Sequence, residues 1–275
     1  MWDFEHPPLE VELATRYQLH YTLPSRCADE LLSGRADLGL IPIASLTPEL
    51  AIVPGCTIAS LDRVRSIQLI VKRPRTLGSI RSVAADNASR SSRVYAEIIL
   101  RRYYENAAEF LTHPADPIAM LQLADAALLI GDPALLAIEA RQEIEDTVGP
   151  CDWFDLAHEW TTLTSMPWVA AVWAVRPDAI AEGRIQPRQL IDDLCQSREH
   201  GLAHIDQLVR EWTPRIALPP ETIRHYLTHN IHYTLTPECR QSILTFRTFA
   251  AEAGVLPAFP ELRFLDSRGS KTIFG

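Results

Sequence analysis

Short apolar runs alternate along this chain with stretches that have helical periodicity. The apolar runs lie at 38–42, 66–71, 80–85, 126–130 and 168–175, and helical patterns occupy 25–33, 91–104 and 117–123 between them. Short apolar runs bounded by Gly and Pro are typical of buried strands. Their alternation with helices predicts an α/β fold, and the run at 38–42 is interpreted as a buried parallel strand.

Two of these runs, 66–71 and 168–175, enclose a segment that is a complete α/β unit in itself. We therefore expect two lobes joined by two crossing strands. Lobe 1 is discontinuous and takes residues 1–75 and 172–275, whereas lobe 2 takes residues 76–171.

The rest of lobe 1 has mixed signals. Residues 12–21 are interpreted as a strand, and the late part of the chain as helices at 187–200, 204–211, 220–229 and 237–253. These late helices are expected to pack on lobe 1. Residues 263–275 carry little apolar pattern, so we expect this tail to be partly loose.

Composition and charge exclude several classes of partner. The 275 residues are 47% hydrophobic, which is enough for a large core, and their net charge of −9 argues against nucleic acid and acidic membranes. Five cysteines without a CxxC pair indicate neither a disulfide framework nor a zinc site. With no leader pattern at residues 1–8 and no membrane-length apolar run, we expect a cytoplasmic protein.

The turn at 86–92 is the first candidate site. It joins an apolar run to a helical pattern and carries Ser89, Arg90 and Ser91. The free N–H groups and positive end of a helix attract anions, and an arginine fork suits a carboxylate. The alternative is that Ser89 or Ser91 only caps the helix.

Three further turns follow predicted strands and are rich in small or hydroxyl residues. They contribute Pro42 and Ile43, Ser60, and Gly131 with Asp132. Ligands of open α/β sheets bind at the carboxyl ends of the strands, so these residues are candidates for substrate binding. For Asp132 the alternative is a cap on the helix that follows.

Histidines and the common catalytic motifs point to no further chemistry. His225, His229 and His232 are spaced along one face of a predicted helix, but no HExxH or cysteine partner accompanies them, and we expect no metal role. Residues 158–160 are expected at the surface. No Walker loop, GxGxxG or GxSxG element supports nucleotide hydrolysis, dinucleotide redox chemistry or the common serine hydrolase scaffold.

Short motifs occur in a fixed order from about residue 35 to residue 253. They lie at 36–42, 52–60, 63–66, 82–86, 89–92, 129–135, 155–156, 159–160, 163–164, 167–169 and 230–233. Together they resemble the chorismate dehydratase family of the futalosine route to menaquinone.

This resemblance implies a bilobed fold like that of type II periplasmic binding proteins, used for catalysis. It implies that the small molecule chorismate loses water to give 3-[(1-carboxyvinyl)oxy]benzoate, with no metal or organic cofactor. It also implies a catalytic Ser89, with Ser89, Arg90 and Ser91 at a substrate carboxylate. Two alternatives are the related 1,4-dihydroxy-6-naphthoate synthase of the same route and a binding-only protein for an aromatic or dicarboxylic anion.

The chain departs from this family at its beginning. Members of the family carry a first strand and a turn with an active-site asparagine upstream of the segment where Met1 lies here. The comparison predicts either a start upstream of Met1 or a product without that strand and asparagine. In both cases a polypeptide that begins at Met1 is expected to be less active than one that carries this strand and asparagine.

Overall fold

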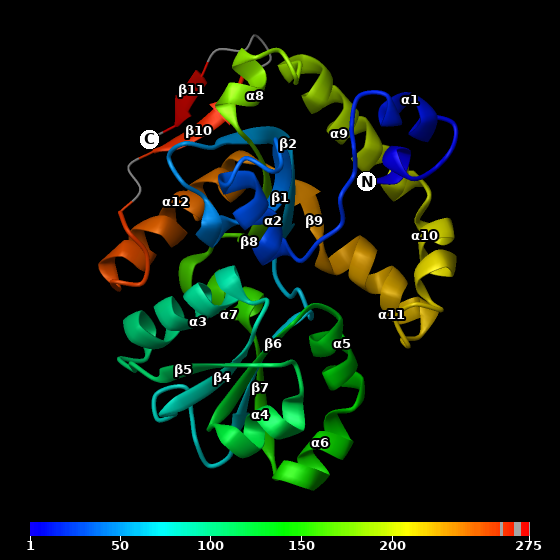
Figure 1. The fold of residues 1–275 in the computed structure, drawn as a ribbon. Helices are drawn as coiled ribbons and strands as arrows, with labels where there is room; N and C mark the ends of the chain where they lie inside the picture. The colour runs from blue at the N-terminus through cyan, green and yellow to red at the C-terminus, as the bar shows by residue number, and fades with distance from the viewer. Residues whose placement is uncertain (259–260, 267–270, 275) are drawn as a thin grey trace. The chain divides into compact units, whose positions relative to one another are not determined.

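Two units, each with its own sheet, make up the computed structural model, which describes residues 1–258, 261–266 and 271–274 (Figure 1). The first unit comprises residues 1–58, 171–237 and 259–275, and the second comprises 59–170 and 238–258. The chain leaves the first unit within strand β2 (Ala51–Ser60) and returns within β8 (Trp168–Val175). The predicted α/β class, with two lobes joined by two crossing strands, is therefore confirmed, and 168–175 is one of the two strands that were expected to cross.

The division of the chain differs from the expected boundaries in two places. The run at 66–71 forms β3 (Ile67–Lys72), which lies inside the second unit and is not a crossing strand. The reason is that β3 pairs along its length with two strands of that unit. Most of helix α12 (Pro237–Glu252) also belongs to the second unit.

The sheet of the first unit has the strand order β1-β8-β2-β10-β11, with β9 paired to β2. The remaining strands are β1 (Leu38–Pro42), β9 (His232–Thr234), β10 (Leu262–Leu265) and β11 (Lys271–Phe274). β1 pairs antiparallel with β8, so the prediction that residues 38–42 form a parallel strand is wrong for this neighbour. β10 and β11 form an antiparallel pair within the tail that was expected to be loose; 267–270 and 275 lie outside the described residues.

Helices make up most of the rest of the first unit. They are η1 (Trp2–Phe4), α1 (Glu10–Ala14), α2 (Pro24–Leu32), η2 (Ile43–Ser45), α8 (Pro177–Ala181), α9 (Pro187–Ala203), α10 (Ile205–Trp212), α11 (Pro220–His225) and the π-helical turn η3 (Tyr226–Asn230). The strand predicted at 12–21 is wrong, since α1 and irregular chain occupy it. Leu13 packs into the same apolar core as Phe4 and Leu190 there, which favours a helix docked by one buried face.

The sheet of the second unit has the order β5-β4-β6-β3-β7. Its other strands are β4 (Ser82–Asp86), β5 (Glu109–His113), β6 (Ala126–Ile130) and β7 (Cys151–Asp155). Its other helices are α3 (Arg90–Tyr103), α4 (Pro117–Leu123), α5 (Gly131–Glu139), α6 (Arg141–Val148) and α7 (Leu156–Thr164). β4 runs parallel to β5 and β6, whereas β3 runs antiparallel to β6 and β7.

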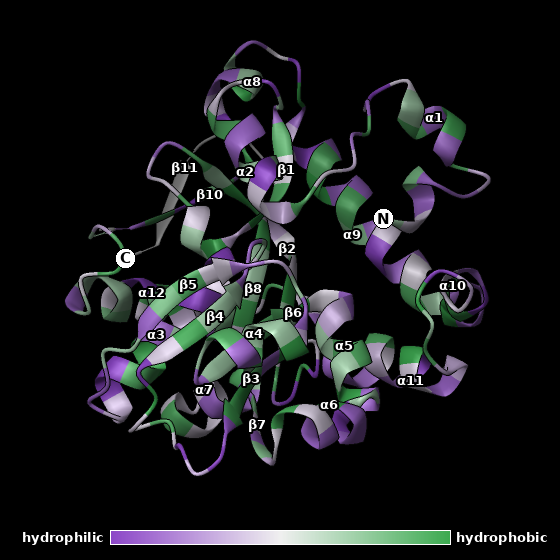
Figure 2. Cartoon of the chain, turned by 60° about the horizontal axis from the view of Figure 1, so that its bottom comes forward, coloured by the Kyte–Doolittle hydropathy of each residue, from purple (hydrophilic) through white to green (hydrophobic). Residues whose placement is uncertain are grey.

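Helices cover the faces of this sheet, and those labelled α3, α4, α5 and α6 in Figure 2 carry both hydrophobic and hydrophilic residues. The central strands β3 and β6 are almost completely buried, which explains their nearly unbroken apolar sequences. Apolar residues of α4, α5 and α6 close one cluster against them.

An aromatic cluster forms a second part of this core. Tyr95 of α3 is fully buried, and its ring lies 4.8 Å from that of Trp160 and 4.4 Å from that of Phe246. The Trp160 Nε1–H donates to Ser242 Oγ at 3.1 Å. The expectation that residues 158–160 lie at the surface is therefore wrong for Trp160, because α12 covers it.

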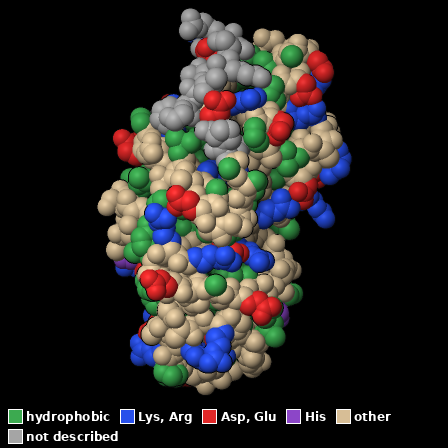
Figure 3. Space-filling model, turned by 90° about the vertical axis from the view of Figure 1, so that its left-hand side faces the viewer, with side chains coloured by type: hydrophobic (Ala, Val, Ile, Leu, Met, Phe, Trp, Pro, Cys, Tyr) green, Lys and Arg blue, Asp and Glu red, His purple; other side chains and the backbone are tan. Residues whose placement is uncertain are grey.

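Acidic and basic side chains are interspersed on the face drawn in Figure 3. Ion pairs such as Arg73 with Asp152, at 2.6 Å, lie at this kind of exposed position and contribute little to stability. Within the described residues, no helix combines the length and the apolar composition that a membrane span requires.

Candidate functional site

Four strands bring candidate residues to one edge of the sheet in the second unit. β4 and β6 are parallel neighbours, with Ala85 opposite Leu128, so their carboxyl ends lie side by side. β3 begins and β7 ends at the same edge, because both pairings of β3 are antiparallel. The 86–92 turn, the Gly131 turn, the 60–66 loop and Asp155 therefore gather there.

The 86–92 turn is closed by its own hydrogen bonds. The backbone N–H and the hydroxyl of Ser89 both donate to the carbonyl oxygen of Asp86, at 2.9 and 2.8 Å. Asp86 Oδ1 accepts from the N–H of Ala88 at 3.0 Å. Ser89 is the N-cap residue of α3, yet its side chain makes no capping hydrogen bond. The alternative that Ser89 is the N-cap is therefore right in position, but its hydroxyl does not cap the helix.

The serines of this turn are all buried. Ser89, Ser91 and Ser92 are each 5% exposed, although they belong to a loop and the first turn of a helix. The Ser91 hydroxyl donates to the carbonyl oxygen of Ala170 at 3.2 Å. Main-chain carbonyls thus hold both the Ser89 and Ser91 hydroxyl protons, and a ligand carboxylate would have to replace these acceptors.

The Gly131 turn lies next to it, at the end of β6. Gly131 has φ +63°, and a Cβ there would meet nothing within 4 Å, so backbone conformation and not crowding favours glycine. Its N–H donates to the carbonyl oxygen of Ser66 at 2.7 Å. α5 begins at Gly131 without a side-chain cap, so Asp132 lies in the first turn and the alternative of an Asp132 cap is wrong. Desolvation raises the pKa of Asp132.

Ser60 leads into the third part of this edge, the 60–66 loop. It ends β2, is 1% exposed, and accepts a long hydrogen bond of 3.4 Å from the N–H of Asp62. Asp62 also pairs with Nδ1 of His158 at 2.6 Å, which ties the loop to α7.

Asp155 holds this loop in place. Its carboxylate accepts from Val64 N–H at 3.3 Å and Arg65 N–H at 2.6 Å, and it caps α7 by accepting from Ala157 and His158. Burial raises the pKa of Asp155, and these four N–H groups oppose the shift. Asp155 was not among the site residues predicted from the sequence. An aspartate directly before a helical pattern is the signal that would have found the cap.

The two candidates in the first unit have a different setting. Pro42 ends β1 opposite Ala171 of β8, and Ile43 is completely buried. The structure thus brings Ser60, Ser89, Arg90, Ser91, Gly131 and Asp132 together in the second unit, and places Pro42 and Ile43 in the first.

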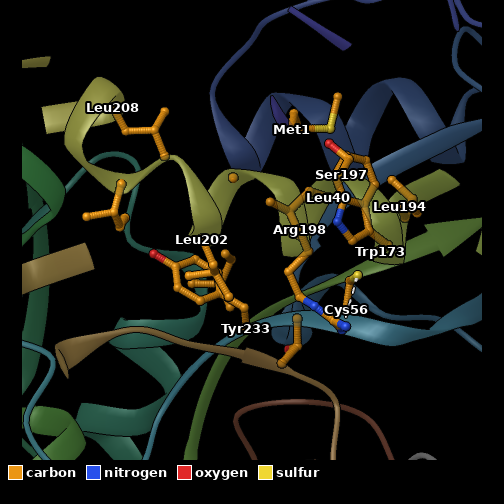
Figure 4. Close-up of a pocket in the computed structure, with 14 residues that line it drawn as sticks. Met1, Leu40, Cys56, Trp173, Leu194, Ser197, Arg198, Leu202, Leu208 and Tyr233 are labelled. Atoms are coloured by element: carbon orange, nitrogen blue, oxygen red, sulfur yellow. Dashed lines mark hydrogen bonds between the residues drawn. The ribbon is translucent and has the colours of Figure 1, made fainter. Parts of the chain in front are cut away.

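The first unit also contains a cavity of about 190 Å³ that the sequence did not predict (Figure 4). Its walls come from β1, β2, β8, β9, α9 and α10, and most of them are apolar, including Leu40, Trp173 and Leu202. Arg198 reaches into it and donates to the carbonyl oxygen of Gly55 at 2.5 Å. Elements so far apart in sequence meet only in the folded chain, so no local pattern announces this cavity.

The three spaced histidines do not line one helix face. His225 and His229 stack at 4.6 Å, but the helix changes to a π-helical turn at Tyr226 and ends at Asn230, which leaves His232 on β9. Among the residues that the structure describes, no three His, Cys, Asp or Glu side chains are grouped so that they could share a metal ion.

Comparisons with known proteins agree with this architecture. A family model described as menaquinone biosynthesis matches residues 2–252. A chorismate dehydratase of Thermus thermophilus is 27% identical over 255 residues, which cover 89% of each chain.

Solved structures share the fold at low sequence identity. Protein AF1704 from Archaeoglobus fulgidus superposes with a TM-score of 0.66 at 14% identity, over 93% of this chain and 94% of that one. The alkanesulfonate-binding protein SsuA from Xanthomonas axonopodis gives 0.57 at 14% identity, over 87% and 83%. The periplasmic aliphatic sulphonate binding protein SsuA from Escherichia coli gives 0.52 at 17%, over 93% and 82%. The predicted likeness to periplasmic binding proteins is confirmed.

Proposed function

Because this chain belongs to the menaquinone biosynthesis family, we propose that it is a chorismate dehydratase, a carbon–oxygen lyase of the futalosine route. Chorismate would lose a proton from the ring carbon that bears the ether oxygen and the hydroxyl group from the neighbouring carbon. The new double bond completes an aromatic ring and gives 3-[(1-carboxyvinyl)oxy]benzoate and water. This elimination needs no electron acceptor, and we expect it to take place in the cytoplasm.

The observation that supports this proposal most is the pair of helix N-termini at one sheet edge. α3 and α5 follow parallel neighbours, β4 and β6, and neither has a side-chain cap. The first N–H groups of a helix have no acceptor within the helix, and the helix dipole adds positive potential. In α5 the Gly131 N–H donates to the carbonyl oxygen of Ser66 and Pro133 has no N–H, so α5 contributes mainly through its dipole. Chorismate carries two carboxylates, so we assign one of them to this edge.

The serines would orient that carboxylate. In the proposed complex, the Ser89 hydroxyl rotates from the Asp86 carbonyl oxygen and donates to a carboxylate oxygen of chorismate. Polarising the carboxylate in this way withdraws electron density from the ring and makes the departing ring proton more acidic. Ser91 and Arg90 would add a second donor and a positive charge.

Asp132 has a separate role in this proposal. Its carboxyl group lies in the first turn of α5, and its raised pKa indicates a site where the negative form is disfavoured. We assign it to the ring hydroxyl of chorismate, which can donate to it. Fixing both ends of the ring would align the breaking bonds.

Incubation with chorismate tests the reaction, with mass spectrometry to detect the enolpyruvyl benzoate and calorimetry to measure binding. We expect the substrate to be bound and its mass to fall by one water. Binding of chorismate without turnover would favour a binding-only protein for aromatic dicarboxylates. The absence of both chorismate binding and turnover would contradict the proposal.

A further inference from the structure

Two of the cysteines, far apart in sequence, lie face to face in the first unit. Cys56 belongs to β2 and Cys195 to α9, 139 positions later, and their sulfur atoms are 4.0 Å apart. The Cys56 thiol donates toward Cys195 Sγ. A disulfide needs a separation of about 2 Å, so the two sulfur atoms must move closer before a bond can form.

The backbone of β2 is shaped to let these sulfurs meet. Gly55, directly before Cys56, has φ +94°, and a Cβ at this position would lie 2.5 Å from Cys195 Sγ. Any larger residue would therefore push Cys195 away. Glycine is required here by both its conformation and the close approach of the thiol.

Small molecules can reach both thiols. Cys56 lines the 190 Å³ cavity (Figure 4), and Cys195 is partly exposed. One water molecule takes about 30 Å³ in the liquid. The cavity is several times larger than this, so it has room for a peroxide molecule, which has two oxygen atoms.

Positive charge accompanies the pair. Arg198 lies one turn after Cys195 on α9, and its Nη1 is 3.9 Å from Cys56 Sγ, as the dashed line in Figure 4 marks. The hydrogen bond from Cys56, aided by the charge of Arg198, lowers the pKa of Cys195. The same hydrogen bond and burial raise the pKa of Cys56. Cys195 is also the more exposed of the two thiols, whereas Cys56 is buried, so we assign Cys195 as the nucleophile.

Among the described contacts, Cys27 and Cys151 have no sulfur neighbour at this distance, and neither has a lowered pKa. Cys27 lies on α2, Cys151 on β7 and Cys239 on α12. Burial raises the pKa of Cys27 and of Cys151. A buried free cysteine usually behaves as a small hydrophobic side chain, which does not explain a paired thiol next to an arginine.

We propose that Cys56 and Cys195 form a peroxide-reactive dithiol that closes to a disulfide between β2 and α9. The Cys195 thiolate attacks one oxygen of hydrogen peroxide and breaks the O–O bond, giving a sulfenic acid and hydroxide. Cys56 then attacks that sulfur, its proton leaves with the displaced hydroxide as water, and the S–S bond forms. Two thiols are oxidised while one peroxide is reduced to two waters. This inference does not depend on the proposed function.

Peroxide treatment of the whole protein tests it. After oxidation, peptide mapping without reductant is expected to show a 56–195 linkage that dithiothreitol removes. Alkylation under denaturing conditions is expected to count two thiols fewer than before oxidation. Because a disulfide across 139 positions restricts the unfolded chain, the wild-type Tm is expected to rise on oxidation.

Variants separate the two sulfurs. Cys56→Ser is expected to trap Cys195 as a sulfenic acid that dimedone labels, Cys195→Ser to form neither product, and Cys27→Ser, the matched control, to behave like wild type. Reduced variants with the same Tm as the reduced wild type are correctly folded. The peptide map of the oxidised wild type tests the disulfide even if a variant fails to fold. The proposal is overturned if peroxide leaves all thiols alkylatable, or if Cys195 is labelled no faster than Cys27.

Discussion

At the scale of single residues, Asp155 combines two tasks in one buried carboxylate. It caps α7 and also anchors the 60–66 loop through the N–H groups of Val64 and Arg65. A buried charge is tolerated when hydrogen bonds replace its hydration, and here four backbone N–H groups do so. The position of the loop at the candidate site therefore depends on a residue of another strand.

Replacing Asp155 with Ala is expected to lower the free energy of unfolding by about 2–4 kcal/mol, because it removes a cap and leaves loop N–H groups unpaired. Urea denaturation measures the change. Asp152→Ala, which breaks an exposed ion pair with Arg73, is the matched control and is expected to cost under about 1 kcal/mol. Equal losses in the two variants would contradict the role given to Asp155.

The pKa of Asp155 also predicts a pH effect. Burial raises its folded-state pKa above 3.8, so the folded protein binds a proton more readily than the unfolded chain. Stability from this group then increases as the pH falls through the folded pKa towards 3.8. The difference in unfolding free energy between wild type and Asp155→Asn is expected to shift in favour of wild type on acidification. A constant difference from neutral pH downwards would exclude this linkage.

Ser89 is the residue on which the proposed chemistry depends most. Ser89→Ala is expected to lower kcat/KM for chorismate by a factor on the order of 10², the usual cost of losing one donor to a developing negative charge. The thermal unfolding temperature is expected to change little. Ser79 precedes β4, at the opposite edge of the sheet, and is exposed, so Ser79→Ala is the matched control. Unchanged turnover in Ser89→Ala would leave Ser89 a purely structural role.

At the scale of elements, α12 completes the core of the second unit although it follows the first unit in sequence. Phe246 is completely buried against Tyr95, and Ser242 accepts the indole N–H of Trp160. Tyr95 in turn donates its hydroxyl to Val169 of β8 at 3.0 Å. The helix thereby covers aromatic rings contributed by α3 and α7.

Phe246→Ala is expected to lower the free energy of unfolding by about 3–5 kcal/mol, because a fully buried ring leaves a cavity. Phe246→Leu keeps most of the volume and is expected to cost roughly half as much or less. Denaturant titration followed by tryptophan fluorescence measures both, since Trp160 reports on the same cluster. Equal losses of unfolding free energy in the Ala and Leu variants would contradict this role for the packing of Phe246.

At the scale of the whole molecule, the second unit is assembled from residues 59–170 and the later segment 238–258. A fragment of residues 59–170 therefore lacks the helix that covers Tyr95 and Trp160. We expect this fragment to have weak near-UV circular dichroism and to gain signal when a peptide of residues 238–258 is added. A full near-UV spectrum without the peptide would show that α12 is dispensable for this core.

Most helices and strands could be predicted because their signals are local. The strands at 126–130 and 168–175 and the helix at 117–123 match their predicted ranges, since apolar runs, Pro and capping residues lie within the elements themselves. The error at 12–21 has the opposite cause. Its alternating pattern fits a strand, but no strand of the described residues pairs with it, and packing of Leu13 favours a helix.

By itself, the sequence determined the α/β class, the positions of most elements and the hydroxyl-rich turns, because periodicity and turn chemistry are encoded within a few residues. Only the tertiary structure decided that β3 and α12 belong to the second unit, that Asp155 anchors the 60–66 loop, and that Cys56 meets Cys195. These contacts join residues about 90 to 140 positions apart. They depend on strand order and helix packing, which are set by the burial of the whole chain and not by any local pattern.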